Sequence, residues 1–206
     1  MCGRYALHAH PDVVTLEFAL RSVPLFAPRY NIAPGAEVLI VRQDGAALAR
    51  WGLVPGWAKD AAVGARLINA RAETLAQKPS FRDAYRRRRC LIPASGFYEW
   101  RGEAGRKQPF YVHPSQGQLF AFAGLWERWR DLETCTVITT DANAAMRAIH
   151  DRMPVIVPRA DYAGWLGGGE GLLKPCPDDI IGIRRVGRAV NDARNDSPAL
   201  LEASDG

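Results

Sequence analysis

The sequence has few lysines, few cysteines and no long apolar segment. No run of its 206 residues approaches the roughly 18 consecutive apolar residues that span a bilayer, so we expect no membrane-spanning helix. The first residues, MCGRYALHAH, lack the basic-then-apolar order of a secretory signal peptide, which predicts a cytoplasmic protein. The four cysteines are scattered as Cys2, Cys90, Cys135 and Cys176, and no CxxC pair occurs, so free thiols are expected rather than a zinc knuckle or redox motif.

Metal and cofactor motifs are also missing. His8 and His10 form an HxH pair, but no carboxylate or cysteine cluster completes a metal site, so we expect neither a metal nor a cofactor. No internal repeat, low-complexity linker or composition break divides the chain. A composition of 48% hydrophobic and 24% charged residues is that of a folded protein, and the length predicts one domain over residues 1–206, acting as a monomer.

Positive charge is concentrated in one segment. The chain has 27 basic residues, of which only 4 are lysine, against 22 acidic residues, so the net charge is +5. Residues 66–107 hold 11 basic and 4 acidic side chains, or +7, which leaves the rest of the chain at −2. GC-rich coding explains an arginine bias, and a charge run is often only a solvated face. The local excess, however, is what a polyanion-binding surface needs.

The hydrophobic pattern predicts many short strands and a few short helices. A turn at Asp44-Gly45 separates two strands, and RYNIAPG at 29–35 is typical of a loop. The expected strands cover residues 37–42, 47–53, 90–93, 96–100, 109–113, 119–126, 134–139 and 154–157. The expected helices cover residues 11–20, about 81–88 after a Ser80 cap, a segment up to 150 capped by Asp141 or Asn143, and 159–166. The pattern predicts an α+β fold with a curled, largely antiparallel, barrel-like sheet.

Cys2 carries the most distinctive chemistry. A small second residue permits removal of Met1, which would leave a free α-amine beside a thiol. An α-amine has a pKa near ~7.7–8.0, against ~10.4 for lysine, so part of it is unprotonated at neutral pH. Amine and thiol on adjacent carbons can convert an aldehyde into a five-membered thiazolidine. The same group can act as an N-terminal nucleophile on an amide, or Cys2 has no role beyond its small size.

Two further motifs offer polar groups in unusual settings. In NARAET, Asn69 and Arg71 face one side of an extended chain, where they suit a sugar or phosphate, although a surface loop explains them equally. In GFYEW, aromatic neighbours would desolvate Glu99 and raise its pKa, which makes it a general acid near neutral pH. Alternation along the strand would instead place Glu99 in solvent.

HDRMP supplies a histidine and an arginine. His150 is either a structural residue or a proton carrier, and Arg152 pairs with Asp151 or reaches a phosphate. Among the tryptophans, Trp51, Trp57 and Trp100 can stack on bases, although most tryptophans are buried in the core.

Six motifs in order resemble one family. They are MCGRY, NIAPG at 31–35, WGLVPGW at 51–57, NARAET at 69–74, CLIPASGFYEW at 90–100 and HDRMPVIV at 150–157, and the ending VNDARNDSPALL at 190–201 fits as well. Together they resemble the SOS response-associated peptidase (SRAP) family, also described as abasic-site processing proteins. The resemblance covers nearly the whole chain.

The resemblance implies a function for named residues. Cys2, exposed by loss of Met1, would attack the aldehyde form of an abasic site in single-stranded DNA and form a thiazolidine crosslink. Asn69, Glu99 and His150 match the other active-site positions of the family. Residues that look like DNA contacts are Arg4, Pro34, Arg71, Trp100 and Arg152. A protein of this kind would be cytoplasmic and would associate with the nucleoid when bound to damaged DNA.

Two alternatives remain open at this point. One is a peptidase or amidohydrolase in which Cys2 attacks a carbonyl and Asn69 stabilises the oxyanion. The other is a non-catalytic reader of single-stranded DNA. The basic segment favours the DNA readings, whereas Cys2 with Glu99 and His150 favours the two reactive ones.

Overall fold

Most of the regular structure is β-strand, in a computed structural model that describes residues 2–103, 107–117 and 119–204. The strands are β1 (Tyr5–Leu7), β2 (Arg29–Ile32), β3 (Glu37–Arg42), β4 (Gly45–Trp51), β5 (Asn69–Arg71), β6 (Arg89–Ala94), β7 (Gly96–Arg101), β8 (Gln108–Pro114), β9 (Phe120–Trp129), β10 (Leu132–Asp141), β11 (Arg152–Pro154) and β12 (Ile181–Arg185). The α-helices are α1 (Pro11–Glu17), α2 (Arg82–Arg87), α3 (Ala144–Arg147) and α4 (Tyr162–Leu166). Short 3₁₀ turns are η1 (Ala61–Arg66), η2 (Arg159–Asp161), η3 (Asp178–Ile180), η4 (Arg188–Asn191) and η5 (Pro198–Leu201).

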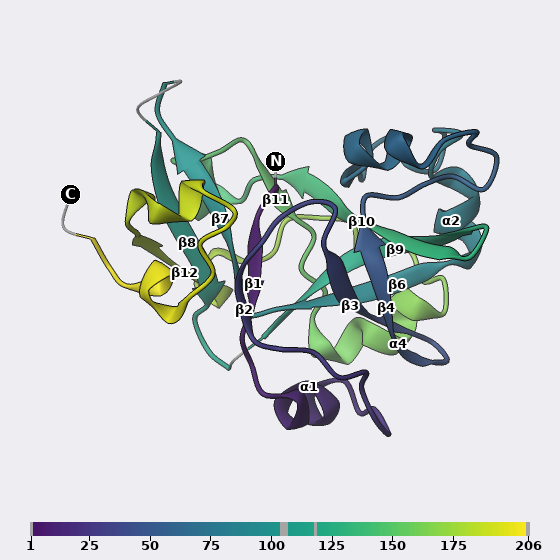
Figure 1. The fold of residues 1–206 in the computed structure, drawn as a ribbon, viewed down its shortest axis with the longest axis horizontal. Helices are drawn as coiled ribbons and strands as arrows, with labels where there is room; N and C mark the ends of the chain where they lie inside the picture. The colour runs from purple at the N-terminus through teal and green to yellow at the C-terminus, as the bar shows by residue number, and fades with distance from the viewer. Residues whose placement is uncertain (1, 104–106, 118, 205–206) are drawn as a thin grey trace.

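Five strands close into a barrel. Antiparallel pairs join β4 to β3, β3 to β6, β6 to β9 and β9 to β10, and β10 then returns to β4 in parallel. Beyond the closed part, β5 and β11 both pair with the end of β10. The predicted α+β fold with a barrel-like, largely antiparallel core is therefore confirmed. Helices α2 and α4 lie outside the barrel (Figure 1).

A second sheet lies against the barrel, in the order β12-β8-β7-β1-β2, with every pair antiparallel. Its inner face contributes Tyr5 and Phe97, whose rings lie 6.1 and 5.9 Å from that of Phe122 on the barrel strand β9. The side chains that join the two sheets are fully buried. The second sheet is thus held on the barrel by aromatic edge contacts, which anchor both the N-terminal residues and β7.

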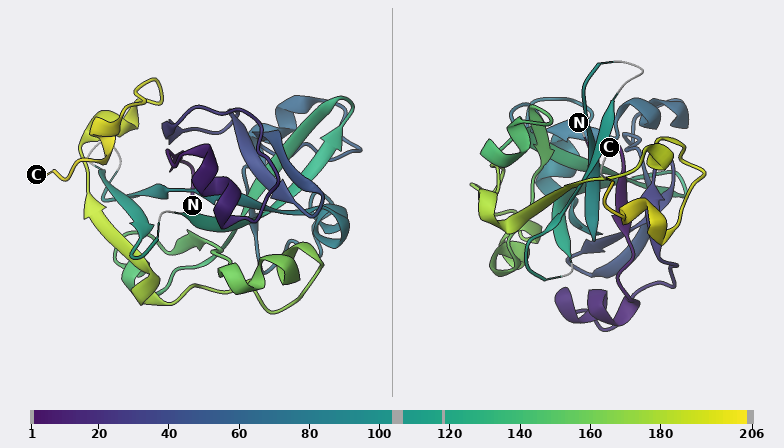
Figure 2. Two further views of the ribbon diagram at one scale, coloured as in Figure 1. Left: turned by 90° about the horizontal axis from the view of Figure 1, so that it is seen from below. Right: turned by 90° about the vertical axis from the view of Figure 1, so that its left-hand side faces the viewer.

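The C-terminal segment covers the outer face of the second sheet. Val186, Val190 and Leu200 are buried with Ala6 and Tyr98 of that face. In Figures 1 and 2 this yellow segment follows β12 and lies over the strands of the second sheet. The two faces of this sheet therefore have different partners, the barrel on one side and residues 186–201 on the other.

The β3–β4 hairpin was predicted correctly, with a small shift. Arg42 pairs with Gly45, so the two-residue turn is Gln43-Asp44 rather than Asp44-Gly45. Gly45 has φ +131°, a backbone conformation that side chains disfavour, which explains a glycine at this position. Four consecutive residues of β3, 38–41, are buried, as expected for a strand inside a closed sheet.

Several predicted boundaries were wrong for local reasons. Helix α1 ends at Glu17 rather than at residue 20, because Ala19 adopts φ +50° and leaves the helical region. The segment 29–35 begins with strand β2 instead of being a loop throughout. Ser80 does not cap α2, whose cap residue is Phe81 without a side-chain bond. Asn143 caps α3 as expected, its Oδ1 accepting from Met146 N at 2.9 Å, but that helix ends at residue 147 rather than 150.

None of the helices in the described ranges is both long and apolar enough to cross a membrane.

Candidate active site

Cys2 and Asn69 meet at one end of the barrel. Strand β5 runs parallel to β10, which places Asn69 beside Val137 and beside the N-terminal residues. The Asn69 Nδ2 donates a hydrogen bond of 2.8 Å to the carbonyl oxygen of Cys2. Cys2 is fully buried, and the buried Oδ1 of Asn69 has no hydrogen-bond partner among the described residues. The Asn69 amide nitrogen therefore fixes the backbone of Cys2, and the amide oxygen can accept a further hydrogen bond.

Glu99 belongs to the same site. It lies on β7 with only 3% of its surface exposed, so the solvent-facing alternative is wrong. Burial raises the pKa of the Glu99 carboxyl, while the charge of His150 acts in the opposite direction. Burial also raises the pKa of the Cys2 thiol, and the charge of Glu99 raises it further. These mutual effects place Cys2, Glu99 and His150 within electrostatic reach of one another.

The Nδ1 atom of His150 lies near both a hydrogen-bond donor and a hydrogen-bond acceptor. Its Nδ1 lies 3.0 Å from the backbone nitrogen of Arg152 and 2.8 Å from a carboxylate oxygen of Asp151. An unprotonated Nδ1 accepts from the Arg152 N–H, whereas a protonated Nδ1 donates to Asp151, and the two cannot hold together. The geometry thus provides a partner for either form of the ring, which suits a group that moves protons.

Arg152 is a buried member of an ion-pair network. Its guanidinium binds both carboxylate oxygens of Glu73, at 2.8 and 3.0 Å, and one oxygen of Asp141 at 2.8 Å. It also donates to the carbonyl of Thr139 at 2.8 Å. These bonds tie β11 and β10 to the NARAET motif. The pairing of Arg152 with Asp151 that the sequence left open does not occur, and a phosphate at Arg152 would have to displace or share Glu73.

Arg4 and Trp100 are tied to the C-terminal segment. Arg4 donates to Asn31 Oδ1 at 2.8 Å and to the carbonyl of Val190 at 2.9 Å, and its guanidinium lies 5.9 Å from the centre of the Trp100 ring. The indole nitrogen of Trp100 donates to Asn191 Oδ1 at 2.8 Å. Both residues, expected as DNA contacts, therefore also hold the ending of the chain.

The remaining expected DNA contacts are exposed. Arg71 and Pro34 both lie at the surface, and Arg71 follows Asn69 on the same side of β5. Of the tryptophans, Trp51 is buried and donates to the carbonyl of Ile68, so it is part of the core. Trp57 is 63% exposed, which leaves its ring accessible for stacking.

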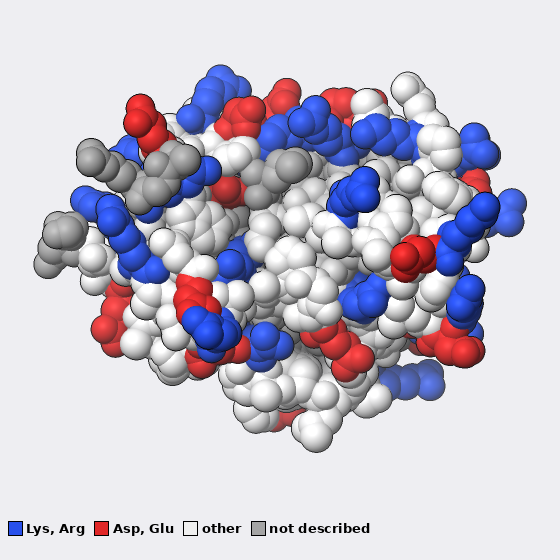
Figure 3. All heavy atoms as spheres, turned by 45° about the horizontal axis from the view of Figure 1, so that its top comes forward, with Lys and Arg blue, Asp and Glu red and all other residues white. Residues whose placement is uncertain are grey.

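The basic segment provides an exposed set of cations. Its exposed members among the described residues are Arg66, Arg71, Lys78, Arg82, Arg86, Arg87, Arg101 and Lys107. Figure 3 shows Lys and Arg atoms in an interrupted band along the upper edge of the molecule in that view. Acidic atoms lie between and behind them, so the band is mixed rather than uniformly positive.

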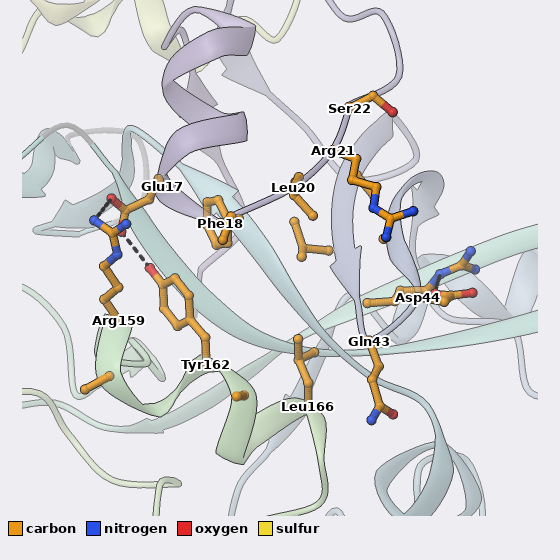
Figure 4. Close-up of a pocket in the computed structure, with 17 residues that line it drawn as sticks. Glu17, Phe18, Leu20, Arg21, Ser22, Gln43, Asp44, Arg159, Tyr162 and Leu166 are labelled. Atoms are coloured by element: carbon orange, nitrogen blue, oxygen red, sulfur yellow. Dashed lines mark hydrogen bonds and ion pairs between the residues drawn. The ribbon is translucent and has the colours of Figure 1, made fainter.

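A separate groove lies away from the candidate site residues. Its volume is about 770 Å³, and Figure 4 shows it between the end of α1, the β3–β4 hairpin and α4, with Glu17 bonded to Arg159 and Tyr162 on one wall. None of the candidate residues lines this groove. Within the described part of the chain, no three His, Cys, Asp or Glu side chains gather as metal ligands would.

Two structural residues of the site escaped the sequence analysis. Asn31 is fully buried within the NIAPG motif and donates to three carbonyls of residues 190–195. Glu73, within NARAET, is the bidentate partner of Arg152. Each is a polar residue inside a motif that the sequence analysis had singled out, and this location could have marked it as a residue with a structural role.

Comparison with known proteins identifies the family of the chain. The sequence profile described as "SOS response associated peptidase (SRAP)" matches residues 1–193. The chain is 41% identical to the abasic site processing protein YoqW of Bacillus subtilis, over 98% of this chain and 100% of that protein. It is 30% identical to YedK of Escherichia coli, over 98% and 99% of the two chains. A crystal structure of a Bacteroides thetaiotaomicron protein superposes with a TM-score of 0.88 at 26% identity, covering 98% of this chain and all of that one. The sequence match, the shared fold and the meeting of Cys2 with Asn69 lead to one conclusion: the chain belongs to the SRAP family.

Proposed function

We propose that this protein processes abasic sites in single-stranded DNA by forming a covalent bond through Cys2. The observation that carries the proposal is the convergence of Cys2, Asn69 and Glu99 in one buried site, with Asn69 bonded to Cys2 at 2.8 Å. Relatives covering the whole chain are named abasic site processing proteins, which supports a role in DNA damage. Without its base, an abasic deoxyribose exposes an aldehyde, the electrophile that an N-terminal cysteine captures.

The crosslinking reaction releases one water, separately from the water that the preceding hydrolysis of the Met1–Cys2 bond consumes. Hydrolysis of the Met1–Cys2 bond first frees the α-amine of Cys2. The amine adds to the C1′ aldehyde of the open sugar, and water leaves to give an iminium. The Cys2 sulfur then adds to the same carbon, the thiol proton passes to a base, and the nitrogen becomes a secondary amine in a thiazolidine ring. Ring closure removes the iminium, which would otherwise favour β-elimination and strand cleavage.

Burial decides how Cys2 and Glu99 share the protons. Burial raises the pKa of the Cys2 thiol, so a nearby base has to remove its proton to give the nucleophilic thiolate. The carboxylate of Glu99 is suited to accept that proton. In its protonated form, favoured by its own raised pKa, Glu99 can donate to the ring oxygen and open the closed sugar. His150 is placed to relay protons with solvent, since its side chain is 28% exposed.

Asn69 acts as a positioning group in this scheme. Its Nδ2 holds the Cys2 carbonyl, and its unpartnered Oδ1 can accept from the amine or a sugar hydroxyl. The Nδ2 has a second hydrogen, which is the donor that the oxyanion role of a peptidase would use, so this hydrogen bond is compatible with aldehyde capture and with amide hydrolysis.

DNA affinity comes from residues around this site. Exposed Arg71 and Arg82 can contact phosphates, and exposed Trp57 can stack on an unpaired base. Phosphate contacts carry no base information, so binding should be indifferent to sequence and should weaken steeply with salt.

The central experiment compares Cys2→Ala with Cys176→Ala. Each variant is mixed with a single-stranded oligonucleotide that carries one abasic site, and the products are separated on a denaturing gel. Cys176 is a matched control because it is also a buried free cysteine but lies beside Asn143. We expect Cys2→Ala to lose the crosslink and to keep noncovalent binding within a few-fold, whereas Cys176→Ala crosslinks normally. A heat-stable crosslink formed by Cys2→Ala would refute the thiazolidine.

Glu99→Gln tests the proton transfer. General acid–base help is worth about 10²–10⁴-fold, so this variant should crosslink slowly rather than not at all. Rates are measured between pH 5 and pH 9 on the same oligonucleotide. A profile equal to that of the unmodified protein would remove Glu99 from the mechanism.

A further inference from the structure

A second polar pocket lies on the other side of the second sheet. Glu99 on β7 faces the barrel side, while the ring of its neighbour Tyr98 packs at a tilt of 48° against Tyr111 on the outer face, with ring centres 5.0 Å apart. The pocket beside Tyr111 has a volume of about 250 Å³. Its lining residues are His8, Ala9, Ser95, Tyr111, His113, Pro114, Gly117, Arg184 and Leu201. None of the proposed catalytic residues takes part in it.

Arg184 on β12 is an uncompensated cation in this pocket. It is partly buried, and its side chain makes no ion pair or hydrogen bond with any described residue. Its guanidinium lies 5.2 Å from the centre of the Tyr111 ring, and its Nε is buried without an acceptor. The buried Nε therefore lacks an acceptor, and an acceptor bound in the pocket would satisfy it.

The other polar groups of the pocket are donors as well. The Tyr111 hydroxyl is buried and has no hydrogen-bond partner among the described residues. The Ser95 Oγ accepts from the backbone nitrogen of His8 at 3.0 Å, which leaves its hydroxyl hydrogen available. Burial, and next the charge of Arg184, lower the pKa of His8, so the field of Arg184 reaches across the pocket. No aspartate or glutamate is among the lining residues.

We propose that this pocket binds a phosphate group. A guanidinium, a phenol and a serine hydroxyl converge without a carboxylate, and a phosphate offers several acceptor oxygens with the compensating charge. A volume of about 250 Å³ is enough for a phosphate group with water. The group is either inorganic phosphate or the terminal phosphate of a nucleic acid, since both present the same oxygens. The site is separate from the lesion chemistry because it occupies the opposite face of β7.

The test is a titration of the full-length protein with inorganic phosphate at constant ionic strength. The imidazole signals of His8 and His113 report binding by NMR, and sodium chloride serves as the blank. We expect a saturable shift that Arg184→Gln weakens at least tenfold, as for the loss of a charge-assisted bond. Tyr111→Phe should weaken it by about threefold or more.

The matched control is Arg185→Gln. Arg185 is the next residue of β12, is exposed, and bonds to Gln108 instead of lining the pocket. It removes the same charge from the same strand, so binding should stay within twofold. A non-saturating titration, or equal weakening by Arg184→Gln and Arg185→Gln, would overturn the proposal and leave only general electrostatic attraction.

Two oligonucleotides distinguish the sources of the phosphate. If a 5′-phosphorylated strand binds more tightly than its 5′-hydroxyl counterpart, and Arg184→Gln abolishes the difference, the ligand is a nucleic-acid end. If the two strands bind equally while inorganic phosphate still saturates the pocket, the ligand is free phosphate. Crosslinking at an internal abasic site should be unchanged in Arg184→Gln, so failure of this proposal and failure of the crosslinking proposal are separable.

Discussion

Asn31→Ala should destabilise the protein far more than an ordinary polar substitution. The Asn31 side chain is fully buried and uses both ends of its amide. Its Oδ1 accepts from the guanidinium of Arg4 at 2.8 Å, and its Nδ2 lies within 2.8–3.2 Å of the carbonyls of Val190, Asp192 and Asn195. Alanine would remove one acceptor from the half-buried Arg4, which keeps its bond to the carbonyl of Val190, and would take the Asn31 donor away from the carbonyls of Asp192 and Asn195.

The size of the effect follows from counting hydrogens. An amide nitrogen has two hydrogens, so three carbonyls share two full bonds, worth about 1 kcal/mol each. The bond from the Arg4 cation adds about 1.5–3 kcal/mol. The sum is about 3.5–5 kcal/mol, a large part of the roughly 5–15 kcal/mol that stabilises a typical domain.

Urea unfolding followed by circular dichroism measures this loss directly. Asn195→Ala is the control, because its Nδ2 makes one exposed bond, to the carbonyl of Ala189 at 2.8 Å, and should cost less than about 1 kcal/mol. Asn31→Asp should be at least as damaging as alanine, since a carboxylate would face three carbonyl oxygens. A loss of unfolding free energy below about 1 kcal/mol for Asn31→Ala would refute the reasoning and show that water replaces the hydrogen bonds of Asn31.

Three further predictions test other parts of the molecule. Glu99→Gln should raise the free energy of unfolding at neutral pH. The raised pKa of the buried Glu99 carboxyl means that the folded state binds the proton of this group more tightly than the unfolded state does. The parent protein therefore loses stability as the pH rises from the pKa of Glu99 in the unfolded chain through its pKa in the folded chain. The advantage of the variant should vanish below about pH 4 in parallel urea melts. Arg152→Gln should lower the free energy of unfolding by about 2 kcal/mol, and Arg71→Gln should lower it by less than about 0.5 kcal/mol. Filter binding should show weaker DNA affinity for Arg71→Gln. Equal unfolding free energies of the two variants would contradict the ion-pair network of Arg152. Gly96→Ala should cost at least about 2 kcal/mol, because a Cβ there would lie 2.5 Å from the carbonyl oxygen of Val112; a parent-like melting temperature would show that the strand shifts freely.

Local patterns predicted the features that depend on neighbouring residues. The β3–β4 hairpin followed from a turn between two apolar runs, and the Asn143 cap followed from its side chain. The boundary of α1 failed because the backbone of Ala19 turns left-handed, which no residue type at that position announces. The strand β2 was missed because its pairing with β1 is supplied by residues far away in the sequence.

The motifs indicated candidate residues that lie near one another, but not the contacts that these residues make. Motif resemblance identified Cys2, Asn69 and Glu99, and the structure brings them together. The resemblance did not indicate that Arg152 and Arg4, which were expected to contact DNA, also bond to other side chains of the protein. Such partners come from sequence separations of 79 and 27 residues, and composition or periodicity carries no information on them.

The closed barrel imposes an order on synthesis. Its last strand, β10 (Leu132–Asp141), is the one that seals the ring against β4, so about two thirds of the chain must leave the ribosome before closure. In the same way, β1 has to wait for β7, whose Phe97 pairs with Tyr5. Contacts this distant in sequence form slowly, and open strand edges are exposed in the meantime. Cys2 is therefore accessible on the nascent chain and buried in the finished one, which gives any enzyme that trims the N-terminus a limited period in which to act.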